Sequence, residues 1–109
     1  MELDQKEIDR LFFALSDSTR RGMLSALTEG ESSLTELGSS YGLTKQAISK
    51  HIKVLHDAGL ITKRRDGRIQ RCRLNPESLQ KVEEVIGSYR KFWEHQFNAL
   101  EDYIESLDE

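Results

Sequence analysis

The sequence predicts a mainly helical chain with a small β-hairpin, in the element order α-α-α-α-β-β-α. Through most of its 109 residues, apolar side chains recur at intervals of three and four, the period of amphipathic helices. Residues 61–74 instead contain Asp-Gly between two short runs, which is among the strongest hairpin signals. The length fits a single domain, residues 1–109, that can bury its own core.

The first two helices are marked by their caps. Asp4 is a suitable N-cap for a helix that ends at Leu15. The apolar stripe of this helix consists of Ile8, Leu11, Phe12 and Leu15. After a polar break, Asp17 or Ser18 is expected to cap a second helix over residues 19–28. The inward-facing residues of the second helix are Met23, Leu24 and Leu27.

The segment 43–61 is the most informative part of the chain. It predicts one helix, capped by Thr44 and ended by Gly59 in a left-handed conformation. One face carries the apolar residues Ile48, Ile52 and Leu55. The opposite face carries polar and basic side chains, namely Lys45, Gln46, Ser49, Lys50 and Lys53. A helix with a buried spine and such an outer face fits the DNA major groove.

The segments on either side of this helix predict another, shorter helix before it and a hairpin after it. A short helix after Ser32, a turn at Gly42 and the polar-faced helix form a helix-turn-helix over residues 33–59. A hairpin is expected next, at residues 61–74, with Asp66-Gly67 as its two-residue turn and the second strand beginning at Arg68.

Charge is unevenly distributed along a chain whose net charge is −3. Residues 44–73 carry nine Lys and Arg against two Asp, a net charge of +7. Residues 1–43 have a net charge of −4 and residues 74–109 of −6. A basic middle between acidic ends is the electrostatic pattern of a segment that binds nucleic acid.

The last helix is too long for the rest of the chain to cover. Asn75 and Pro76 mark its start, and its apolar residues form a seam of about 45 Å. A body of about 13 Å radius of gyration cannot bury that seam, so the same helix of a second copy is the simplest partner. We therefore expect a homodimer held by residues 1–15 and 77–108. The expected interface residues are Phe12, Leu15, Tyr89, Trp93, Phe97, Leu100 and Ile104.

Three stretches together resemble the ArsR/SmtB family of winged helix-turn-helix repressors. Residues 11–21 are similar to the family's junction between helices 1 and 2, residues 43–61 to its recognition helix, and residues 64–68 to its wing. The tail, residues 89–94 and 100–103, is similar to a metal-independent branch that contains SdpR-like regulators. The resemblance implies a winged helix-turn-helix fold and a dimeric repressor bound to an inverted repeat in double-stranded DNA.

The recognition helix offers five candidate DNA contacts. Gln46 can make a bidentate contact to adenine, and Lys45 or Lys50 can reach guanine acceptors. Ser49 can contact a base or a phosphate, whereas Lys53, a turn further along, is better placed for phosphate.

The hairpin and the second helix supply further arginines. Arg65 and Arg68 flank the expected hairpin tip, where a minor-groove or phosphate contact is natural. Arg71 and Arg73 share strand parity, and both DNA contact and pairing with acidic residues remain open for them. For Arg20 we expect a structural ion pair rather than a phosphate contact.

Two other functions fit parts of the same sequence. A metal- or redox-responsive repressor of the same fold is one alternative, and a winged-helix interaction module without DNA binding is another. His95 with the nearby acids falls short of a zinc ligand set, and Cys72 has no resolving partner in its chain. We therefore expect no metal and no cofactor.

Neither catalysis nor membrane insertion is predicted. The sequence contains no nucleophile elbow, phosphate-cradling glycine loop or zinc-protease helix motif, so we expect no enzyme. No apolar run approaches the roughly 20 residues of a membrane span. The expectation is a cytoplasmic protein without a membrane partner.

Overall fold

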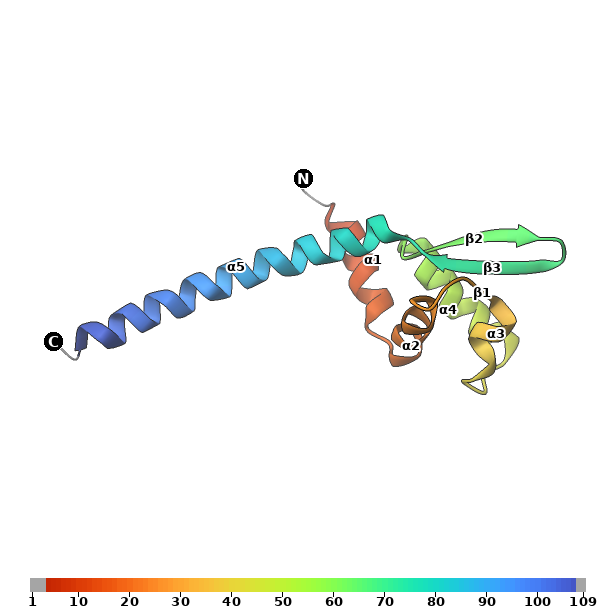
Figure 1. Ribbon diagram of the computed structural model, residues 1–109, viewed down its shortest axis with the longest axis horizontal. Coiled ribbons are helices and arrows are strands. Elements are labelled where there is room, and N and C mark those ends of the chain that lie inside the picture. The colour runs from red at the N-terminus through yellow and green to blue at the C-terminus, as the bar shows by residue number, and fades with distance from the viewer. Residues whose placement is uncertain (1–3, 108–109) are drawn as a thin grey trace. The chain divides into compact units, whose positions relative to one another are not determined.

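The computed structural model describes residues 4–107 (Figure 1). The expected dimerisation segments 1–15 and 77–108 extend beyond these limits, so residues 1–3 and 108 lie outside the described residues. The elements are α1 (Gln5–Leu15), α2 (Ser18–Leu27), β1 (Ser32–Ser33), α3 (Leu34–Ser39), α4 (Lys45–Asp57), β2 (Ile61–Asp66), β3 (Ile69–Leu74) and α5 (Pro76–Leu107). The chain divides into two compact units, Met1–Leu79 and Gln80–Glu109.

Side-chain caps begin the first four helices, as their sequences require. Asp4 and Asp17 accept hydrogen bonds from backbone N–H groups at the starts of α1 and α2. The Oγ of Ser33 and the Oγ1 of Thr44 do the same for α3 and α4, at 3.1 Å each. Each cap satisfies a backbone donor that has no partner within its helix. Thr44 and Asp4 therefore cap as predicted, and Asp17 is the cap of α2.

The end of α4 is closed by Gly59, also as predicted. Its φ of 77° is left-handed, a region that glycine enters without a steric cost. The N–H of Gly59 donates to the carbonyl of His56 at 2.9 Å, and the N–H of Leu60 donates to that of Leu55 at 3.0 Å. These two bonds form a Schellman motif, which satisfies the last carbonyls of the helix and turns the chain into β2.

The sheet contains one strand more than the sequence predicted. It is antiparallel with the order β1-β3-β2, and Ser32 of β1 pairs with Cys72 of β3. Two serines carry no alternation of polar and apolar residues, so periodicity gives no sign of this strand. The mainly helical class with a hairpin is confirmed, with β1 added between α2 and α3.

The hairpin turn lies one residue further along than predicted. Asp66 pairs with Ile69, so the two loop residues are Gly67 and Arg68, and β3 begins at Ile69 rather than Arg68. Gly67 has a φ of 64° and Arg68 does not have a positive φ, the pattern of a type II′ turn, which places Gly first. The correction puts Arg68 in the loop itself.

The core of the first unit is formed by α1 to α4 and the base of the sheet. Its buried apolar side chains are Leu11, Ala14, Met23, Leu24, Leu27, Leu37, Ile52, Leu55, Leu60, Ile61 and Cys72. The predicted inward residues of α2 and the spine residues Ile52 and Leu55 of α4 are among them. Burial of these side chains fixes which face of α4 remains outside.

The helix α5 runs for 32 residues from Pro76. Asn75 accepts a hydrogen bond through Oδ1 from the N–H of Glu77 at 3.3 Å, which agrees with its predicted capping role. Large apolar side chains of the second unit are exposed: Ile86, Tyr89, Phe92, Trp93, Phe97, Leu100, Tyr103, Ile104 and Leu107. No helix within residues 4–107 has the length and apolar character needed to cross a membrane.

Candidate nucleic-acid interface

The outer face of α4 presents the predicted recognition residues together. Lys45, Gln46, Ser49, Lys50 and Lys53 are all exposed. The opposite face is fixed in the core, since Ile52 is 2% exposed and Leu55 is fully buried. A helix held on one side by its own chain can offer the other side to the edges of base pairs. The geometry therefore brings these five predicted residues onto one surface.

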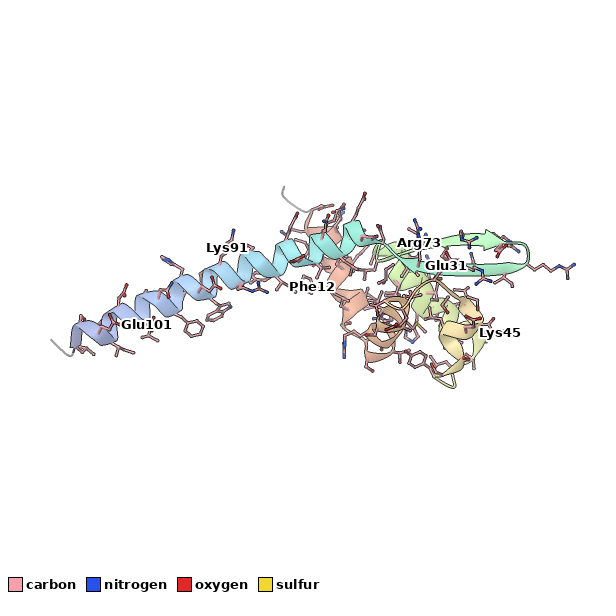
Figure 2. The ribbon with its side chains drawn as sticks, in the orientation of Figure 1. Phe12, Glu31, Lys45, Arg73, Lys91 and Glu101 are labelled. Atoms are coloured by element: carbon pink, nitrogen blue, oxygen red, sulfur yellow. The ribbon has the colours of Figure 1, made fainter. Side chains whose placement is uncertain are left out.

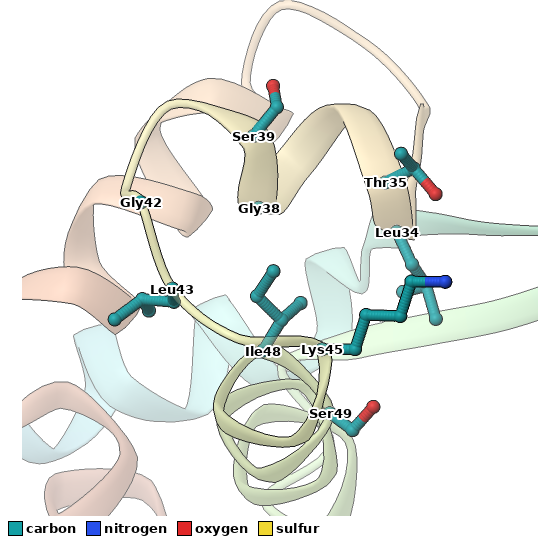
Figure 3. A pocket seen from close by; sticks show the side chains of 9 residues that line it. All are labelled: Leu34, Thr35, Gly38, Ser39, Gly42, Leu43, Lys45, Ile48 and Ser49. Carbon is teal, nitrogen blue, oxygen red and sulfur yellow. The ribbon is translucent and has the colours of Figure 1, made fainter.

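A groove of ≈ 390 Å³ separates α3 from the first half of α4 (Figure 3). Figure 3 shows Ile48 pointing from α4 towards Gly38 of α3, where an added Cβ would overlap the Ile48 side chain. Gly38 thus permits the close approach of the two helices. The polar side chains that line the groove are Thr35, Ser39, Lys45 and Ser49.

A second groove, of ≈ 480 Å³, lies between α3 and the hairpin. It is lined by residues 33–36 on one side and by Arg68, Ile69 and Gln70 on the other. Because Leu34 and Thr35 line both grooves, the first turn of α3 lies between the start of α4 and the hairpin tip. Thr35 and Ser39 were not predictable from the sequence, because isolated hydroxyls on a short helix carry no pattern.

Among the predicted contact residues of α4, Lys53 already has a partner. Its Nζ lies 2.9 Å from Oδ2 of Asp57, one helical turn further along, and both side chains are at least half exposed. The hydrogen bond from Lys53 is the largest cause that lowers the pKa of Asp57 below its ordinary value. An exposed pair of this kind is weak, so Lys53 is restrained but available to a phosphate.

The inner side of α4 is tied to the junction of α1 and α2. Nη1 of Arg20 lies 3.2 Å from Nδ1 of His51, and Arg20 is only 7% exposed. Its Nε and Nη2 donate to the carbonyls of Ala14 and Phe13 at 2.8 Å, and its guanidinium lies 5.0 Å from the centre of the Phe13 ring. Arg20 is therefore structural, but its side chain bonds to two helix-end carbonyls and the His51 ring rather than forming the predicted ion pair with an acid.

The hairpin has two faces with different side chains. Lys63 and Arg65 share one face, where they lie opposite Cys72 and Gln70. The other face carries Arg64, Arg71 and Arg73, along with Asp66 and Ile69. Arg65 is exposed on the first face, and Arg68 is exposed in the turn.

Two of the arginines on this second face, Arg64 and Arg71, are paired with acids. Arg64 donates through Nε and Nη2 to the two carboxylate oxygens of Glu31, at 3.1 and 2.6 Å. Nε of Arg71 lies 3.2 Å from Asp66 and 4.0 Å from Glu31. Of the two possibilities left open for Arg71, pairing with acids is the one observed. Glu31 was not singled out, because its partners lie more than thirty residues away in the chain.

The predicted dimer residues of the second unit are exposed. Trp93 and Phe97 are 58% and 62% exposed, and their ring centroids lie 6.2 Å apart. Tyr89, Leu100 and Ile104 are also more than half exposed. On α1, Phe12 is 37% exposed and Leu15 is partly buried.

The residues considered for sensing are Cys72 and His95. Among residues 4–107 of one chain, no three His, Cys, Asp or Glu side chains gather as metal ligands would. Cys72 is fully buried at the base of the sheet, and burial raises the pKa of its thiol. A buried thiol with little thiolate reacts poorly with oxidants.

Comparison with known proteins identifies the family. A helix-turn-helix domain family matches residues 15–64. The HTH-type transcriptional regulator YuzN of Bacillus subtilis is 44% identical over 81 residues, 68% of this chain and 88% of the relative. The transcriptional repressor SdpR of the same organism is 32% identical over 73 residues, 67% of this chain and 81% of the relative.

A solved structure supports the same family. The crystal structure of the ArsR family transcriptional regulator RHA00566 matches with a TM-score of 0.80 at 30% identity, over 86% of this chain and 97% of that one. The chain therefore belongs to the ArsR family of helix-turn-helix transcriptional regulators, as the resemblance implied. Membership confirms the expectation of a regulator rather than an enzyme.

Proposed function

We propose that this member of the ArsR family is a homodimeric transcriptional repressor that binds an inverted repeat in double-stranded DNA. The observation that carries the proposal is the division of α4 into a buried apolar face and an exposed face of three lysines, a glutamine and a serine. These are side chains that donate to base edges and phosphates in the major groove.

Each exposed residue of α4 has a role that follows from its chemistry and position. Gln46 makes a bidentate contact to adenine, and Lys45 and Lys50 donate to guanine acceptors. Ser49 contacts a base or a phosphate, and Lys53 contacts a phosphate.

The wing adds contacts beside the major groove. Arg68 in the turn and Arg65 on the adjoining strand reach the minor groove or the phosphates that flank it. The shared lining of the two grooves supports this arrangement, because it puts the turn and the start of α4 on either side of α3.

A second copy of the chain completes the protein. The exposed apolar side chains of α5 recur at intervals of three and four from Ile86 to Leu107, which suits packing against an identical helix. Phe12 and Leu15 of α1 are further residues that we assign to the contact with the second copy. A dimer places two copies of α4 in successive major grooves, about one helical turn apart, so the operator is an inverted repeat. Such a regulator acts in the cytoplasm, where it meets chromosomal DNA.

An electrophoretic shift assay with the upstream region of the gene itself tests the proposal. We expect a discrete complex that withstands an excess of random duplex. Lys50→Ala should weaken this complex, whereas Lys6→Ala, which removes an exposed lysine from α1, should not. Equal affinity for upstream and random DNA would contradict the proposal.

A further inference from the structure

One face of the hairpin carries Arg64, Arg71 and Arg73, and none of these three arginines takes part in the DNA contacts proposed above. Arg64 and Arg71 are directly opposite one another in the register, and Arg73 lies two residues further along β3 on the same face. Like charges placed opposite in a sheet repel each other, so this arrangement destabilises the hairpin unless an anion lies between them.

Glu31 is the anion that the chain supplies. It directly precedes β1, which pairs with β3, and this pairing carries Glu31 to the arginine face. Figure 2 shows Glu31 and Arg73 close together at the base of the hairpin. The hydrogen bond from Arg64 is the largest cause that lowers the pKa of Glu31, and the charges of Arg71 and Arg73 lower it further.

The pair between Arg64 and Glu31 has the geometry in which arginine also binds phosphate. Two nitrogens of one guanidinium face two oxygens of one anion, and a phosphodiester offers the same pair of oxygens. The Arg64 side chain is 57% exposed, so a phosphate can approach it from solvent. An exposed ion pair contributes little net stability, so replacing one anion by another costs little free energy.

We propose that Arg64, Arg71 and Arg73 form a second phosphate-binding face of the wing, and that Arg64 exchanges Glu31 for a DNA phosphate when the protein binds DNA. The proposal rests on the proposed DNA-binding function. Glu31 then lowers the affinity for every duplex, because each complex must first break the pair. Phosphates carry no sequence information, so Glu31 leaves the ratio of operator to random affinity unchanged.

Fluorescence anisotropy with a labelled random duplex tests the exchange at several salt concentrations. We expect Glu31→Gln to bind about three- to tenfold more tightly than the wild type at low salt, since its neutral amide competes poorly with phosphate. Arg64→Ala should reduce the slope of log K against log salt by about 0.9, the contribution of one phosphate contact. The double variant, Glu31→Gln with Arg64→Ala, should bind the random duplex no more tightly than Arg64→Ala alone.

A matched control separates exchange from a general change of charge. Glu29→Gln removes the same charge two residues away, and the Glu29 carboxylate makes no ion pair among the described residues. We expect little gain from it. An equal gain in both glutamine variants, or no gain in Glu31→Gln, would overturn the proposal.

The salt slope of Arg64→Ala gives a second, independent readout. It does not depend on how well the Glu31→Gln wing folds, and an unchanged slope would overturn the exchange by itself. If the wild type bound neither operator nor random DNA, the proposed function would fail as well. Operator binding that depends on Lys50 but not on Arg64 or Glu31 would remove only this inference.

Discussion

The helix α4 and the second unit of the chain, Gln80–Glu109, are both amphipathic but have opposite exposure. In α4 the apolar face is buried, with Leu55 fully enclosed, and the polar face is open. In the second unit the apolar side chains are open, with Trp93 and Phe97 about 60% exposed. The contrast shows that α4 buries its apolar face within its own chain, whereas the second unit leaves a large apolar surface exposed, as a helix that packs against a partner does.

The largest effect should come from placing a charge on the apolar seam. We expect Phe97→Glu to weaken dimerisation at least about 100-fold, because an unpaired carboxylate in an apolar interface costs about 3–5 kcal/mol. Operator affinity should fall with it, since one recognition helix alone reads half of the site. Sedimentation equilibrium measures the first effect and anisotropy the second.

Asn98→Glu is the matched control for this change. Asn98 follows Phe97 directly but lies away from the seam by the 3.6-residue period of the helix. It adds the same charge and should leave the dimer intact. Monomers in both variants, or a full-strength dimer in Phe97→Glu, would show that the apolar side chains of the second unit do not hold the dimer.

A smaller effect is expected from the buried side of α4. Arg20→Ala should lower the free energy of unfolding by about 2–3 kcal/mol, because it leaves the carbonyls of Phe13 and Ala14 and the ring of His51 without their charged donor. Chemical denaturation measures this. Arg21→Ala removes an exposed guanidinium that donates to Leu15 and should cost about 0.5–1 kcal/mol. Equal losses of unfolding free energy in Arg20→Ala and Arg21→Ala would show that Arg20 does not fix the inner face of α4.

The open side of α4 should affect binding without affecting folding. Lys50→Ala is expected to weaken operator binding by about 1–3 kcal/mol and to relax the preference at one base pair. Its unfolding free energy and its dimerisation should match those of the wild type. An equal loss of affinity for all DNA sequences would show that Lys50 contacts a phosphate rather than a base.

The smallest effect belongs to the pair between Lys53 and Asp57. The folded pKa of Asp57 is lowered, so the pair stabilises the protein above the ordinary aspartate pKa of about 3.9, and this contribution is lost as the pH falls through the folded pKa. Lys53→Ala should return the pKa of Asp57 towards its ordinary value in an NMR titration. The same substitution should weaken DNA binding less than Lys50→Ala, and a larger loss would show that the pair does not restrain Lys53.

Sequence periodicity predicted α4 and α5 well because both helices are long and carry distinct caps. Thr44, Gly59 and Asn75 act as their residue types require, and Ile52 and Leu55 are buried as the pattern predicted. The family followed from the same residues, because the recognition helix, the wing and the junction of the first two helices occur in the right order.

Features that depend on contacts between distant residues were not predictable in this way. The strand β1 is two serines that take their conformation from β3. The observed hairpin turn lies one residue further along than predicted, because both Asp66-Gly67 and Gly67-Arg68 satisfy local turn preferences. The pairing of Glu31 with Arg64 spans more than thirty residues, and only the sheet topology brings them together.

The proposed function requires that two copies of the chain, joined through α5, read one DNA duplex with two copies of α4. Sedimentation analysis of the protein mixed with a footprinted operator duplex measures how many chains bind each duplex. We predict a single complex of two chains per duplex, which Phe97→Glu abolishes and Asn98→Glu preserves. A complex of one chain per duplex with wild-type affinity in Phe97→Glu would contradict the claim.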